Sequence, residues 1–145
     1  MTEQQPQWQP LSMLPTFSDM VDGMLESSEE QLATMQQVVN RPHALDDATL
    51  NRVIKLYDEQ LEDHWLFEEQ FARWKKETRS ENEAREVDRL VVQSAKLKSA
   101  NEEILTIAHS IEHLTIDKVM AMDETELAIK VLSGEMKPPS FPSSG

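Results

Sequence analysis

His64 and Glu68 are residues whose types and spacing could support metal chemistry. They are four positions apart, so on a helix both side chains can point toward one ion. An apolar stripe at helical spacing continues from Leu61 to Phe71 and places His64 and Glu68 on it. A carboxylate on such a stripe is costly to bury unless it is paired or binds a metal. We therefore expect both side chains to be mostly buried and partnered. The alternative is that the helix bends and leaves Glu68 in water, or that Glu68 meets a cation from a neighbouring helix.

A second candidate site is the string His109-Ser-Ile-Glu112-His113. Two histidines four positions apart on a helix can clamp one metal ion. The string also satisfies H-x-x-E-H, the inverted zincin motif, which needs a further acidic ligand well downstream. Only 32 residues follow His113 and no catalytic cleft is indicated, so the pattern does not favour a protease. The alternative is ordinary surface histidines, with His109 beside an apolar stripe and His113 nearer the polar side of the helix.

Two motifs of hemerythrin-like non-haem iron proteins resemble the strings His64-x-x-x-Glu68-Glu69 and His109-x-x-Glu112-His113. The resemblance implies that these strings lie on adjacent helices of an up-and-down bundle and that His64, Glu68, His109 and His113 help to hold two irons. The sequence departs from the family pattern, because no histidine lies in the first expected helix and none follows His113. The gap between the two motifs is also longer than the family uses. Iron binding is therefore the alternative function.

The elements that would position these residues are long helices. From His43 to Ser133 the chain contains neither glycine nor proline, the strongest local breakers of secondary structure. Strands would need turn residues every eight to twelve positions. The stretch is instead rich in Leu, Ile, Ala, Glu, Lys, Gln and Arg, which enter helices at little cost. The sequence predicts an all-α protein, an up-and-down helical bundle built on a long antiparallel helical hairpin.

Local signals place the helix ends. The first helix is expected to open near Thr16 or Ser18 and to end before Pro42, which cannot continue the ladder of hydrogen bonds. Asp46 or Asp47 caps the second helix, and Ser80-x-x-Glu83 is a capping box for the third. The expected helices cover residues 18–39, 46–78, 80–121 and 123–132. We expect a flexible lead-in over residues 1–15, a single bundle domain over 16–136 and a flexible tail over 137–145.

The position of the hairpin turn decides whether the two histidine motifs can meet. A second capping box, Ser99-x-x-Glu102, could break the third helix, but without glycine or proline nearby we favour a continuous helix. A continuous hairpin turning near residue 79 separates His109 from His64 by roughly 20 Å. It brings His109 and His113 toward the start of the second helix instead. Such a cluster could at best bind an adventitious metal ion.

The second helix also carries a belt of large apolar side chains that no single neighbouring helix can cover. Trp65, Leu66, Phe67 and Trp74 project on several sides of the expected helix. Because tryptophan and phenylalanine are enriched at interfaces, we expect these four residues to form a partner interface as well as core. The eight methionines of the chain add adaptable apolar surface or fill the core.

The charge balance limits the class of partner. The chain has 27 acidic and 14 basic side chains, a net charge of −13, which disfavours nucleic acid and anionic membranes and suits basic proteins, cationic segments or metal ions. No cysteine is present, and no signal peptide or apolar run of about 20 residues is found, so we expect a cytoplasmic protein. No nucleophile–base pair or cofactor fingerprint indicates an enzyme. We therefore expect a non-catalytic protein–protein interaction module without a cofactor, with a homodimer as the expected assembly.

Overall fold

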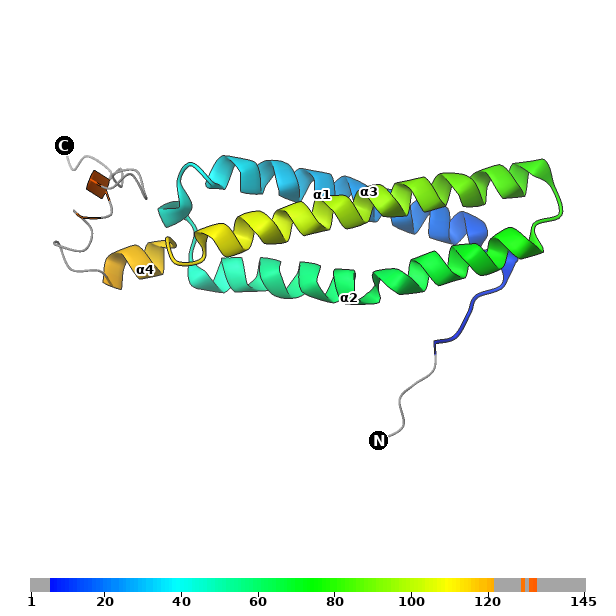
Figure 1. Ribbon diagram of the computed structural model, residues 1–145, viewed down its shortest axis with the longest axis horizontal. Helices are drawn as coiled ribbons and strands as arrows, with labels where there is room; N and C mark the ends of the chain where they lie inside the picture. The colour runs from blue at the N-terminus through cyan, green and yellow to red at the C-terminus, as the bar shows by residue number, and fades with distance from the viewer. Residues whose placement is uncertain (1–5, 122–128, 130, 133–145) are drawn as a thin grey trace, which may run out of the picture.

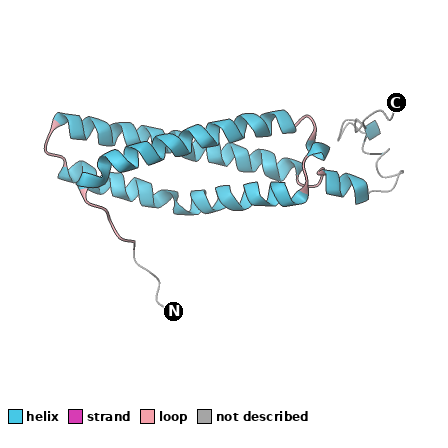
Figure 2. Ribbon diagram, turned by 180° about the vertical axis from the view of Figure 1, so that it is seen from behind, coloured by secondary structure: helices cyan, strands magenta, loops and turns pink. Residues whose placement is uncertain are grey.

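Three long helices lie side by side along one long axis in the computed structural model (Figure 1). The structure describes residues 6–121, 129 and 131–132. In chain order the elements are η1 (Leu11–Met13), α1 (Leu14–Val38), η2 (Pro42–Ala44), α2 (Asp47–Glu77), α3 (Glu81–Ile111) and α4 (Ile116–Ala121). Helices and loops account for all of the described residues, and none of these residues forms a strand (Figure 2). The predicted all-α bundle built on an antiparallel α2–α3 hairpin is confirmed.

The expected caps define the ends of α2 and α3. The Asp46 carboxylate accepts a hydrogen bond from the Thr49 backbone N–H at 2.7 Å, which satisfies a free donor in the first turn of α2. At the start of α3, the Glu83 backbone N–H donates to the Ser80 hydroxyl at 3.2 Å. The Glu83 carboxylate in turn accepts from the Arg79 backbone N–H at 3.0 Å. The capping chemistry read from the sequence therefore positions the turn between α2 and α3.

The third helix runs unbroken through Ser99, as expected, but it ends earlier than predicted. We expected one helix over residues 80–121, whereas α3 stops at Ile111 and α4 begins at Ile116. The break between α3 and α4 is stabilised by hydrogen bonds to residues just before and at the start of α2. The Ile116 backbone N–H donates to the Leu45 carbonyl at 2.7 Å, and the Thr115 hydroxyl donates to the Asp47 carboxylate at 2.6 Å. These tertiary hydrogen bonds pair polar groups that would otherwise lose their partners where the helix ends. Most of the expected last helix, 123–132, and the tail 137–145 lie outside the described residues.

The amino-terminal part of the chain also differs from the expectation. Residues 1–15 were expected to be a flexible lead-in, but η1 and the first turn of α1 lie within that range. Pro15 fits there because the first turn of a helix needs no backbone donor at that position. Immediately upstream, Trp8 and Gln9 pack against α2, as described below. The described lead-in is therefore part of the packed structure from residue 8 onward, and residues 1–5 lie outside the described residues.

The helix α3 packs closely along both α1 and α2, whereas α1 and α2 approach each other less closely. Two apolar clusters fill the interior. One, near η2 and α4, contains Met35, Leu50, Tyr57, Ile104, Leu105, Ala108 and Ile111. The other, near the α2–α3 turn, contains Leu14, Val21, Phe71, Trp74, Val87 and Leu90. Among the described residues no helix is both long and apolar enough to cross a bilayer.

A polar layer lies between the two apolar clusters. It consists of Gln60 and His64 on α2 and of Ser94 and Asn101 on α3. The Asn101 amide nitrogen donates to the Gln60 side-chain oxygen at 3.0 Å, and Asn101 is almost fully buried. The Ser94 hydroxyl donates to the Val91 carbonyl at 3.0 Å. The interior is thus apolar at both ends and contains polar side chains in the middle, beside the buried Leu97 and Ala100.

Candidate functional site

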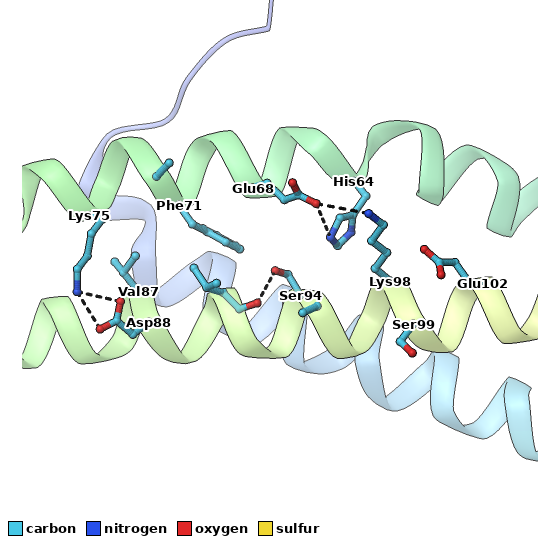
Figure 3. A pocket seen from close by; sticks show the side chains of 13 residues that line it. His64, Glu68, Phe71, Lys75, Val87, Asp88, Ser94, Lys98, Ser99 and Glu102 are labelled. Carbon is cyan, nitrogen blue, oxygen red and sulfur yellow. Dashed lines mark hydrogen bonds and ion pairs between the residues drawn. The ribbon is translucent and has the colours of Figure 1, made fainter.

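His64 and Glu68 differ in their burial. His64 is buried, with 4% of its surface exposed, and this confirms the expectation for the histidine. The side chain of Glu68 is 58% exposed, so the expectation that it is buried was wrong. The long carboxylate side chain extends from the edge of the helix into solvent instead of following the apolar stripe. Figure 3 shows the Glu68 carboxylate facing both His64 and Lys98, and its Oε1 atom is 3.5 Å from His64 Nε2 and 3.9 Å from Lys98 Nζ.

Burial controls the protonation of His64. Removal of the imidazole from water lowers the pKa of His64 below its usual value of 6.5, because the charged form loses hydration. Glu68 and Glu102 oppose this effect, and Lys98 reinforces it. The ring also lies edge-on to Phe67, with centroids 6.2 Å apart. These surroundings favour the neutral imidazole.

The second histidine motif lies at the other end of the hairpin. His109 and His113 are both exposed, and His109 Nδ1 is 3.7 Å from Glu112 Oε1. His113 lines a shallow recess of about 200 Å³ together with Asp47 and Asn51. Asn51 precedes His64 by 13 residues on α2, or roughly 20 Å of helix. The structure therefore does not bring the two motifs together, and within the described residues no group of three or more His, Asp or Glu side chains is arranged to hold a metal.

A first groove, the α2–α3 groove, runs beside His64 on the outer side of the hairpin and has a volume of about 680 Å³. Its lining residues are His64, Glu68, Phe71, Ala72, Lys75, Val87, Asp88, Val91, Ser94, Ala95, Lys98, Ser99 and Glu102 (Figure 3). Charged side chains pair across it. Lys75 Nζ lies 2.8 Å from the Asp88 carboxylate, and Lys98 lies near Glu68. Much of the charge in the α2–α3 groove is thus paired within the groove itself.

The four expected interface residues divide between core and surface. Trp74 is fully buried and its indole N–H donates to the Gln9 carbonyl at 2.9 Å, so the structure corrects the expectation that Trp74 faces a partner. Trp65 is 52% exposed. Leu66 and Phe67 are half-buried and line a second groove. Part of the belt is therefore covered within the chain by α1 and the amino-terminal segment.

This second groove, the α1–α2 groove, lies where the two helices diverge and has a volume of about 540 Å³. Its lining residues are Pro6, Gln7, Trp8, Gln9, Phe17, Met20, Met24, Leu56, Glu59, Gln60, Asp63, Leu66, Phe67 and Gln70. Two large apolar side chains open to solvent there, Met20 at 41% exposure and Leu56 at 49%. The floor includes an edge-to-face contact between Phe17 and Phe67, with centroids 6.4 Å apart. The groove is lined mainly by apolar side chains, with glutamines and two carboxylates among them, and it is accessible from outside.

The charged residues of the α1–α2 groove are both acidic. Glu59 and Asp63 are exposed on α2, and neither forms an ion pair with any residue that the structure describes. By contrast, an acidic residue of α1 that faces α3 has a cationic partner. Asp22 of α1 receives two hydrogen bonds from Arg89, at 2.9 and 3.0 Å, which lower the pKa of Asp22. The α1–α2 groove therefore keeps its negative charge uncompensated, whereas the α1–α3 contact does not.

The amino-terminal segment closes one end of the α1–α2 groove. The Gln9 backbone N–H donates to the Gln70 side-chain oxygen at 2.7 Å, and the Gln70 amide donates back to the Gln9 carbonyl at 3.3 Å. Trp8 lies edge-on to Trp65, with centroids 6.2 Å apart, and the Arg73 guanidinium lies 4.5 Å from a Trp8 ring centroid. This end of the groove already holds an extended peptide by its backbone and by an aromatic side chain.

Sequence reasoning missed most of this groove. Met20 and Met24 were noted only as adaptable apolar surface, and Phe17, Leu56 and Trp8 were given no role. One signal was available, because a tryptophan in a segment otherwise rich in glutamine and proline has little reason to remain in water. The divergence of α1 from α2 is a tertiary property and has no local signal.

Comparison of the chain with protein-family models, with curated proteins and with solved structures found no match. The site must therefore be interpreted from its own geometry.

Proposed function

We propose that this chain is a non-catalytic protein-binding module and that the α1–α2 groove is its docking surface for a protein partner. The observation that carries the proposal is an open apolar groove that exposes Met20 and Leu56 above an aromatic floor. Large contiguous apolar surface exposed on a folded chain marks interaction sites, because leaving it in water costs free energy.

The composition of the groove suits recognition of apolar side chains. Methionine is unbranched and polarizable, so Met20 and Met24 can adjust to partner side chains of different shape. Phe17 and Phe67 supply a firmer floor, held by their mutual contact and by the contact of Phe17 with Trp74, whose centroids are 5.0 Å apart. The fixed floor keeps the ordering cost of binding low, whereas each methionine that becomes ordered costs about 0.5–1.5 kcal/mol.

The intramolecular contacts at the end of the groove supply a second line of support. Gln70 and Trp74 bind the backbone of Gln9, while Trp65 and Arg73 hold the ring of Trp8. The open part of the groove continues from these contacts along α2 and presents Met20 and Leu56 to solvent. Binding of a protein segment there would extend along α2 what this helix already does with the amino terminus of the chain.

Site-specific photo-crosslinking in the native host cells would test the proposal. A benzophenone amino acid is placed at Leu56 in the groove and, as a matched control, at Val92, which is similarly exposed on α3 outside both grooves. We expect a discrete adduct from Leu56 and none from Val92. The captured protein, once purified, should bind the wild-type chain and should lose binding to a Met20→Glu/Met24→Glu variant that keeps its helical spectrum. Equal adducts from both positions, or undiminished binding by the variant, would overturn the proposal.

A further inference from the structure

Resting on the proposed function, we infer that the partner docks in the α1–α2 groove as a cationic amphipathic helix. The first reason is the charge around the groove. Glu59 and Asp63 on its rim lack a cation among the described residues. An occupant with Lys or Arg at matching positions would neutralise both.

The wider charge distribution also indicates a positively charged partner. The helix α1 contains five acidic residues, Asp19, Asp22, Glu26, Glu29 and Glu30, and no Lys, Arg or His. The facing stretch 56–63 of α2 contains four more, Asp58, Glu59, Glu62 and Asp63, and again no Lys or Arg. Only Asp22 of these nine forms an ion pair among the described residues, with Arg89. Both helices therefore carry acidic side chains that attract cations over about a Debye length of 8–10 Å, and Glu59 and Asp63 bring this charge to the groove itself.

The shape of the groove points to a helix. The residues of α2 that line it extend from Leu56 to Gln70, and Gln9 is bound at the Gln70 end. The open part from Leu56 to Leu66 is about 15 Å of helix, which matches a partner helix of about three turns. On α1 the lining positions Phe17, Met20 and Met24 are spaced by three and four residues, as the ridges of a helix surface are. Because α3 packs along both other helices while α1 and α2 diverge, a helix in this groove would complete a four-helix arrangement.

The same observations argue against a second copy of this chain as the occupant. A second copy brings its own net charge of −13 to walls that are already acidic. Self-association would then strengthen as salt screens the repulsion, whereas binding of a cationic helix weakens with salt. The direction of the salt dependence separates the two occupants.

Fluorescence anisotropy with synthetic peptides and the full-length chain would test the inference. The probe is a peptide of about 14 residues with leucines recurring every three or four positions and lysines elsewhere. One control peptide has the same composition in scrambled order, and another carries Glu in place of every Lys. We expect the helical cationic peptide to bind at least about tenfold more tightly than the scrambled peptide, with no binding of the acidic peptide. Equal affinity for the scrambled peptide would overturn the inference, since it would show attraction to net charge alone.

Matched variants of the chain localise the binding. Glu59→Gln/Asp63→Gln removes the two rim charges, and Glu77→Gln/Glu103→Gln removes two exposed acidic residues that lie outside the groove and form no ion pair among the described residues. We expect the rim variant to weaken peptide binding about tenfold, the effect of two partly screened charge pairs, and the control variant to weaken it less than about twofold. Equal losses in both variants would refute docking in the groove.

The failure of this inference is distinguishable from failure of the proposed function. Suppose that Leu56 crosslinks a partner whose binding is lost in Met20→Glu/Met24→Glu, but that the cationic peptide does not bind. The groove is then a docking surface for a different kind of segment. If neither assay gives a groove-dependent signal, both proposals are refuted. Self-association that strengthens with salt and is lost in Met20→Glu/Met24→Glu would assign the groove to a second copy and would refute the cationic helix.

Discussion

Replacement of His64 by leucine should remove a specific part of the dependence of stability on pH. In the folded chain burial lowers the pKa of His64 below 6.5, the value expected when the chain is unfolded. Well above pH 6.5 the imidazole is neutral in both states and contributes no pH dependence. As the pH falls through 6.5, the unfolded chain binds the proton first, so the free energy of unfolding decreases. The decrease stops once the pH has passed the lowered pKa of the folded state.

The size of this effect has an upper bound. A group that binds a proton only when the chain is unfolded lowers the free energy of unfolding by about 1.4 kcal/mol between about pH 7.5 and about pH 5.5. Glu68 and Glu102 lie close enough to stabilise the imidazolium and reduce this value, while Lys98 increases it. The decrease in the free energy of unfolding that His64 contributes in wild type should therefore be greater than zero and smaller than this bound. In His64→Leu the His64 contribution should be absent, because leucine does not titrate.

Urea unfolding followed by circular dichroism at the two pH values would measure the effect. The quantity of interest is the difference between wild type and His64→Leu, which cancels contributions from all other titrating groups. Asp22 and Glu86 add little within the window, because hydrogen bonds from Arg89 lower the pKa of both carboxyls and keep them ionised. His109→Leu, at an exposed position, serves as the control. An equal loss of stability in wild type and His64→Leu, or a gain for wild type at the lower pH, would refute the reasoning.

Four further predictions concern stability. Gln70→Ala removes two hydrogen bonds to Gln9 and should speed hydrogen exchange at the Gln9 amide, with a cost of about 1–2 kcal/mol; unchanged exchange would contradict the contact. Ile104→Ala should cost about 2–5 kcal/mol in urea unfolding, since the side chain is fully buried. Ser80→Ala should cost about 1 kcal/mol by loss of the α3 cap, measured in the same way. Gly23→Ala should raise the thermal midpoint by the equivalent of about 0.5–1 kcal/mol, because an added methyl group at this helical position meets no atom within 4 Å.

Local chemistry predicted most of the fold. The absence of glycine and proline, together with the caps at Asp46 and Ser80, was sufficient to predict α2, α3 and the turn between them. The break between α3 and α4 could not be predicted in this way. It depends on hydrogen bonds from Thr115 and Ile116 to residues about 70 positions earlier in the chain, which no local pattern reveals.

The candidate site was predicted less well than the fold. The apolar stripe correctly indicated that His64 is buried, but side-chain length decides the exposure of Glu68, and a helical wheel ignores length. The belt predicted Leu66 and Phe67 as interface residues, and both line the α1–α2 groove, but it did not show that the amino-terminal segment covers Trp74. The exposure of Glu68 thus follows from the length of its own side chain, whereas the burial of Trp74 follows from the segment that packs opposite it.

The polar layer between the apolar clusters has a consequence for the alignment of α2 with α3. Apolar contacts specify the alignment of two helices less strictly than a hydrogen-bonded pair does, because apolar side chains can repack at modest cost. A slip of one helical turn would bring Leu97 or Leu105 opposite Gln60 and would separate Gln60 from Asn101. The buried Asn101 amide, left without its partner, would cost about 1–3 kcal/mol. The Gln60–Asn101 pair therefore selects one register of the hairpin and, with it, the positions at which Glu59 and Asp63 meet the groove.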